Sequence, residues 1–127
     1  MFALARITAI LVVGALLMAG AATAAKTTFT GAWTGVDTDD GSTILVLIGA
    51  ENASGGVRVT LIDQFASACG AAATALGSGT TSGSTLTGTF DVRCGGELLV
   101  TDAPFEFELS GEVLLGEPIE FHRVGKG

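Results

Sequence analysis

Tyrosine is absent from this chain of 127 residues, and tryptophan and histidine each occur once. A single imidazole with no cysteine or second histidine nearby cannot form an ordinary zinc site. That histidine, His122, lies in an alternating stretch with Glu120, and we expect it to face solvent. No serine–histidine–aspartate set stands out among the many serines and aspartates. We therefore expect no enzymatic activity, no metal site and no cofactor.

Basic side chains are also few, since six Lys and Arg stand against 13 Asp and Glu and the net charge is −7. A negative field of this kind opposes binding to nucleic acid or to an anionic membrane surface. Membrane-spanning β-barrels carry aromatic girdles, which one tryptophan and no tyrosine do not supply. We expect no nucleic-acid partner, and no membrane span once an N-terminal signal has been removed.

The longest apolar run, residues 7–18, lies at the start of the chain and follows a single positive charge, Arg6. Small residues come next, including the tripeptide Ala22-Thr23-Ala24. A basic start, a short apolar segment and a small-residue cleavage site are typical of a secretory signal peptide. The sequence therefore predicts a signal peptide at residues 1–25, one domain at residues 26–127, and a secreted or periplasmic location. An uncleaved anchor is the alternative, because the apolar run and the small residues after it carry no charge.

Two cysteines, Cys69 and Cys94, belong to the predicted exported domain. In an oxidising compartment an even pair indicates a disulfide. A domain of roughly a hundred residues buries a modest core and often needs a covalent cross-link of this kind for stability. Closing a loop of this length stabilises a fold by about 3 kcal/mol. Two buried free thiols are the alternative to this predicted Cys69–Cys94 bridge.

Short apolar or alternating runs, separated by Gly, Ser, Asp and Asn, make up the rest of the chain, which is the pattern of an all-β domain. Alanines 71–73 are expected in a loop or a short helical turn, and Pro104 is expected to interrupt or edge its strand. No connection has room for a crossover helix, so we predict a small antiparallel meander barrel of about eight strands. A two-sheet β-sandwich is the alternative. The predicted strands cover about residues 29–37, 43–48, 57–62, 74–81, 85–93, 97–101 with 105–109 beyond Pro104, 112–115 and 119–124.

The stretch Gly31-Ala32-Trp33 on the first predicted strand resembles the Gly-x-Trp motif of the lipocalin-like (calycin) barrels. In that family a basic residue on the last strand packs across the tryptophan at the closed end of the barrel. Arg123 lies on the last predicted strand, in phase with Phe121. The resemblance thus implies structural roles for Gly31, Trp33 and Arg123, and a cation–π contact is a physically suitable partner for an inward arginine.

An eight-stranded barrel is just wide enough to be filled by side chains or to hold one small ligand. Six aromatic side chains could point inward and fill much of it: Phe29, Trp33, Phe90, Phe105, Phe107 and Phe121. We expect a non-catalytic binding module, with a small apolar ligand or a protein as its partner, and no ligand-binding residue can be assigned. The alternative is a protein-interaction or protease-inhibitor module with a filled core, similar in size to small secreted bacterial inhibitors of metalloproteases.

Overall fold

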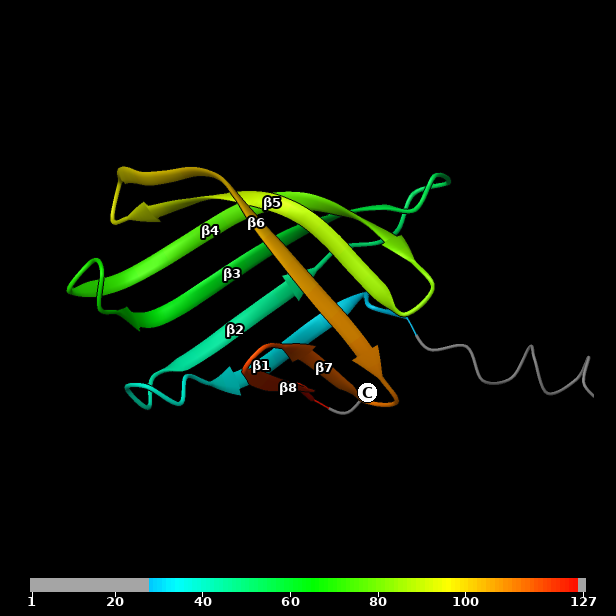
Figure 1. Cartoon of the computed structure of the whole chain (residues 1–127), viewed down its shortest axis with the longest axis horizontal. Helices are drawn as coiled ribbons and strands as arrows, with labels where there is room; N and C mark the ends of the chain where they lie inside the picture. The colour runs from blue at the N-terminus through cyan, green and yellow to red at the C-terminus, as the bar shows by residue number, and fades with distance from the viewer. Residues whose placement is uncertain (1–27, 126–127) are drawn as a thin grey trace, which may run out of the picture.

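A computed structural model describes residues 28–125, and the predicted signal peptide at residues 1–25 lies outside them. The eight strands of the described part pair with their sequence neighbours, and β8 pairs with β1, so the sheet closes into an antiparallel barrel (Figure 1). The predicted all-β barrel is confirmed, and the β-sandwich alternative is wrong. No helix among residues 28–125 is long and apolar enough to cross a membrane. The strands are β1 (Gly31–Val36), β2 (Thr43–Ile48), β3 (Gly56–Ala66), β4 (Ala71–Ser82), β5 (Thr85–Cys94), β6 (Glu97–Ser110), β7 (Val113–Gly116) and β8 (Ile119–Arg123).

The structure corrects the sequence prediction on β4 and, on β6, favours the edge position of Pro104 over an interruption. Strand β6 runs without a break through Pro104, which is paired with Thr89 of β5. A proline is tolerated there because, among the described residues, no strand pairs with the other edge of β6 at that position. Alanines 71–73 begin β4 and form no helical turn. The partners supplied by β3 and β5 override the helix preference of alanine in this stretch.

The interior of the barrel is packed with apolar side chains from all eight strands, and β4 contributes only the small side chains of Ala73 and Ala75. Three contacts join four phenylalanine rings in a chain: Phe90 to Phe105 at 4.7 Å, Phe105 to Phe107 at 5.4 Å, and Phe107 to Phe121 at 5.9 Å between centroids. Phe107 and Phe121 are buried, whereas Phe90 and Phe105 remain partly exposed. The side chains with less than 2 % exposure are Trp33, Val46, Val59, Leu86 and Leu114.

Glycines allow β4 and β5 to approach closely where the barrel wall bends. A Cβ on Gly88 would overlap the Ser78 carbonyl oxygen, and one on Gly79 would lie 2.9 Å from Leu86 Cδ1 and 3.1 Å from Phe105 Cζ. Strand interiors use glycine in this way where another group approaches closely. The Phe105 ring occupies the space that side chains at Gly79 and Gly88 would take. The two glycines therefore allow this ring to pack inside the barrel.

The two ends of the barrel differ. The Trp33 end carries the start of β1 and the end of β8, which are paired through Trp33 and Arg123. At the far end, β3 continues past Asp63, the last residue paired with β2, and β6 begins at Glu97, far before its pairing with β7 at Glu108. We call the part that projects beyond the barrel the sheet extension, residues 64–73 and 92–102.

Candidate functional site

Trp33 and Arg123 form the best-defined side-chain constellation in the described part of the chain. Trp33 is fully buried, and its Nε1 donates a 2.9 Å hydrogen bond to the Phe29 carbonyl oxygen. The guanidinium carbon of Arg123 lies 4.1 Å from the centroid of the indole. Stacking of this kind is worth about 1–2 kcal/mol when the cation is largely desolvated. The pair therefore seals one end of the barrel.

Arg123 also fixes the chain that leads into β1. Its Nη1 donates to the Thr30 carbonyl oxygen at 3.0 Å, and its Nη2 donates to that of Thr28 at 2.6 Å. Gly31 has a φ of 138°, and a Cβ there would lie 2.8 Å from Arg123 Nη1. The positive φ favours glycine at this position, and the absence of a side chain leaves room for the guanidinium. The three residues named by the resemblance, Gly31, Trp33 and Arg123, thus meet at one place.

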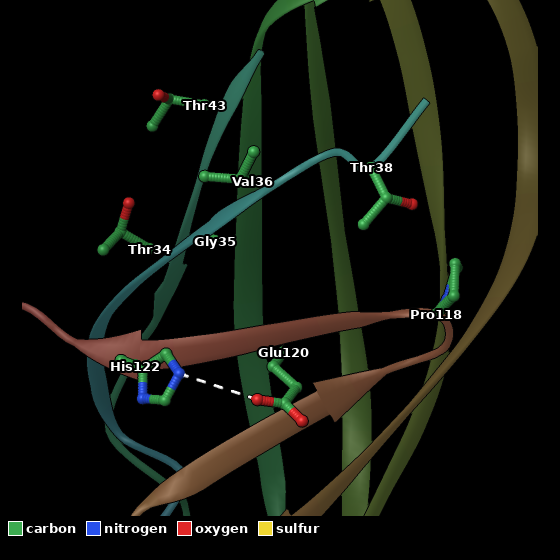
Figure 2. A pocket seen from close by; sticks show the side chains of 8 residues that line it. All are labelled: Thr34, Gly35, Val36, Thr38, Thr43, Pro118, Glu120 and His122. Carbon is green, nitrogen blue, oxygen red and sulfur yellow. Dashed lines mark ion pairs between the residues drawn. The ribbon is translucent and has the colours of Figure 1, made fainter. Parts of the chain in front are cut away.

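A cleft of about 550 Å³ lies on the outer wall where β1 and β8 diverge beyond their pairing at Thr34 and His122 (Figure 2). His122 Nε2 and Glu120 Oε1 are 3.8 Å apart, and their side chains are 61 % and 67 % exposed. An ion pair this exposed is worth about 1 kcal/mol at most. No group of three or more His, Cys, Asp or Glu residues among residues 28–125 is placed to hold a metal ion.

A second cleft, of about 520 Å³, is acidic and opens between β6 and β7. It is lined by Glu106, Glu108, Leu115 and Glu117. The two strands pair only from Glu108 toward Ser110, so β7 leaves the edge of β6 at this point. Glu108 accepts hydrogen bonds from Ser84 Oγ at 2.6 Å and from Thr85 Oγ1 at 3.1 Å. We call this feature the acidic cleft.

Large apolar side chains are exposed mainly at the far end. Eight such side chains are exposed within residues 28–125, and five of them lie at this end of the barrel: Val36, Phe65, Leu98, Leu99 and Val100. The last three are consecutive residues of β6 with 50 %, 46 % and 42 % exposure. Val100 is paired with Val92 and Leu98 with Arg93, which are adjacent on β5 and point to opposite faces, so apolar side chains are exposed on both faces of β6 there. Clustered exposure of this kind marks an interaction surface more often than scattered single residues do.

The other edge of β6 is open between Glu97 and Phe107, since no strand of the described part pairs with it there. On its paired side, β6 shifts register against β5 near Asp91 and again near Leu99. Asp102 has a φ of 52°, and its N–H donates to Asp91 Oδ1 at 3.0 Å. Main-chain donors and acceptors on an open edge can pair with a further strand.

The predicted disulfide between Cys69 and Cys94 is confirmed, with 5.5 Å between the Cα atoms. It joins the turn between β3 and β4 to the last residue of β5. Both ends of this bond lie in the sheet extension, which lacks the support of β2 and β7. The disulfide therefore holds in place the part of the sheet that carries Leu98, Leu99 and Val100.

The charge of the described part is strongly negative, because residues 28–125 contain 13 Asp and Glu and three arginines. One of the arginines, Arg123, is committed to Trp33. In the turn before β2, hydrogen bonds from the backbone and side chain of Ser42 lower the pKa of Asp40 below its ordinary value. The carboxylates keep the surface anionic, and the acidic cleft is the place where three of them line one hollow.

No protein-family model, curated protein or solved structure matches this chain. The eight-stranded antiparallel barrel is consistent with a calycin-like architecture. Sequence reasoning missed the open edge of β6 and the acidic cleft. The apolar run Leu98-Leu99-Val100 was the available signal, since it breaks the alternation expected of a strand with one buried face.

Proposed function

We propose that this protein is a non-catalytic, lipocalin-like binding module that uses the far end of its barrel to bind a partner polypeptide. The observation that carries the proposal is the exposure of Leu98, Leu99 and Val100 on a strand with an open edge. An extended polypeptide can add to such an edge through main-chain hydrogen bonds, while neighbouring side chains select its sequence. The apolar side chains would lose their contact with water in the complex.

The packing of the interior favours a protein partner over a small apolar ligand inside the barrel. Trp33, Leu86 and Leu114 fill the Trp33 end with no exposed surface. Toward the far end, the Phe105 ring lies against Gly79 and Gly88 and stacks on Phe90. Pockets for apolar ligands are concave and bury most of the ligand, whereas the two clefts described above open on the outer wall.

The Cys69–Cys94 disulfide favours a rigid binding surface. A strand edge that is already ordered loses less conformational freedom on binding than a flexible segment does. The bond also supports the proposal that the protein is exported, because disulfides persist in oxidising compartments. We therefore propose a secreted or periplasmic protein that presents a fixed strand edge to its partner.

Site-specific cross-linking in the native host tests this proposal. A photoreactive amino acid at Leu99 is expected to capture one polypeptide, and the same group at Leu47, which is exposed on β2, is the matched control. Native mass spectrometry of the untreated protein supplies the second measurement. A bound small apolar molecule in that spectrum, together with no cross-link specific to position 99, would overturn the proposal in favour of a ligand carrier.

A further inference from the structure

We infer that the partner strand is basic: an extended segment that pairs with β6 between Ala103 and Phe107 and places alternate Lys or Arg side chains in the acidic cleft. This inference rests on the proposed function, because it assumes that the open edge of β6 binds a polypeptide. To the proposed function the inference adds the chemical class of the partner strand and the part of the β6 edge with which that strand pairs.

The acidic cleft lies beside the open edge. Glu106 and Glu108 are two residues apart on β6, so they share one face of the strand. They lie on the outer face, because Phe105 and Phe107 alternate with them and point into the barrel. Glu117 faces them across the cleft from the turn between β7 and β8. A strand added to β6 would run between these two walls and would hydrogen-bond mainly to Glu106, because Pro104 offers this edge a carbonyl oxygen but no N–H.

The spacing of a sheet fixes the pattern of the partner. Side chains directly opposite one another on paired strands have Cβ atoms about 4.5–5.5 Å apart, and opposite charges there attract. A basic residue opposite Glu106 would therefore meet that carboxylate on the outer face, with Glu108 as its diagonal neighbour, since Glu108 itself is paired with Leu115 of β7. The partner positions on either side of this basic residue would lie toward Phe105 at the rim of the barrel, which is partly exposed. The partner sequence should alternate basic and apolar residues.

Charge also argues against a second copy of this chain as the occupant. Two copies paired through β6 would each bring Glu106 and Glu108 to the contact, and both carry a strongly negative surface. Like charges opposite one another on paired strands are destabilising. Charged residues, proline and bulges are the usual devices that prevent edge-to-edge pairing of identical proteins. Here the same glutamates that repel a copy attract a basic strand, which gives the edge its specificity.

Binding of short synthetic peptides to the exported protein tests the inference. The probe is a capped, dye-labelled seven-residue peptide of alternating lysine and valine, measured by fluorescence anisotropy. Two further peptides replace every lysine by glutamine or by glutamate, and a fourth carries N-methyl groups on alternate amides. The triple variant Glu106→Gln, Glu108→Gln, Glu117→Gln removes the charge of the cleft. Its matched control, Asp39→Asn, Asp40→Asn, Glu51→Gln, removes the same charge elsewhere.

The expected result is that the lysine peptide binds best and that the triple variant binds it about ten-fold more weakly. The control variant should bind it nearly as well as the parent protein, and N-methylation should abolish binding. Equal binding of the glutamine and lysine peptides, with no effect of the triple variant, would overturn the basic-partner inference and leave edge binding intact. Failure of every peptide to bind would overturn both proposals. A concentration-dependent dimer in sedimentation, disrupted by Val100→Lys, would show that a second copy is the occupant.

Discussion

The guanidinium carbon of Arg123 lies 4.1 Å from the centroid of the Trp33 ring, and the two residues are directly paired on β8 and β1. This contact joins the first and last strands of the barrel, which share only two paired positions. Closure of the sheet thus depends on the contact between Trp33 and Arg123 as well as on the backbone pairing of β1 with β8. The same guanidinium holds the carbonyl groups of Thr28 and Thr30.

Substitution of Arg123 by Met should lower the free energy of unfolding by about 2 kcal/mol, because it removes the cation–π contact, two charge-assisted hydrogen bonds to carbonyl oxygens and the exposed ion pair with Glu112. Urea denaturation followed by the fluorescence of Trp33 measures both the stability and the environment of the indole. Arg58→Met is the matched control, since Arg58 is exposed and should change stability by no more than about 0.5 kcal/mol. Equal effects of the two variants would show that the contact with Trp33 contributes nothing measurable.

Alanine at Gly88 should destabilise the barrel by about 3 kcal/mol or prevent folding, because the new Cβ would overlap the backbone of β4. Gly96→Ala is the control, since a Cβ there meets no atom within 4 Å and the φ of Gly96 is not in the positive region. Thermal unfolding monitored by circular dichroism compares the two. A Gly88→Ala protein as stable as the control would contradict the close approach of β4 and β5.

The double variant Cys69→Ser, Cys94→Ser should lose about 3 kcal/mol of stability, because its unfolded chain is no longer constrained. The loss should affect the sheet extension first, since both cysteines lie there. Hydrogen exchange read by mass spectrometry should show faster exchange at residues 92–102 than at β1. Uniformly faster exchange throughout the chain would argue that the disulfide supports the whole barrel equally.

Truncation of Phe107 to Ala should cost about 3–5 kcal/mol and open a cavity next to Phe105 and Phe121. The variant should then bind a small apolar probe such as benzene, whereas the parent protein should not. Phe65→Ala is the matched control, because Phe65 is 42 % exposed and packs outside the core. Binding of benzene by the parent protein in its interior would contradict a filled barrel and would favour the ligand-carrier function.

The carboxyl group of Asp40 should titrate below its ordinary pKa, because it accepts hydrogen bonds from the backbone and side chain of Ser42. A lowered pKa in the folded state means that this group stabilises the fold above its unfolded pKa. That contribution is lost as the pH falls through the folded pKa. NMR titration of Asp40 checks the direction, and Ser42→Ala should raise the pKa toward the ordinary value. An unchanged titration in Ser42→Ala would assign the shift to the backbone donor alone.

Local patterns were sufficient to predict most of the strands. The alternation at Phe105, Phe107 and Leu109 and the branched run at 43–48 identified β6 and β2, and the observed bounds of β2 equal the predicted ones. The prediction was wrong where the local signal was weak or conflicting. Alanines 71–73 suggested a loop or a helical turn, yet they begin β4 because β3 and β5 supply their partners. Pro104 was expected to interrupt or edge its strand, and it lies within β6 where the other edge of the strand is unpaired.

The candidate binding surface was less accessible to sequence reasoning. The three residues Leu98, Leu99 and Val100 are visible as an apolar run, but a run of this kind is equally typical of a buried strand. Its exposure depends on where β7 leaves β6, which is a property of the closed sheet. The acidic cleft has the same origin, because Glu117 is brought opposite Glu106 only by the path of the hairpin formed by β7 and β8.

The sequence by itself determined the fold class, the meander order and the pairing of the two cysteines, because period-two alternation, short turns and an even cysteine count are local or compositional features. The tertiary structure decided how fully the barrel is packed and which edge stays open. Both depend on how far each strand extends past its neighbour, and strand ends are set by the partners available rather than by residue preference. The open edge of β6, and with it the proposed function, arises from that mismatch in strand lengths.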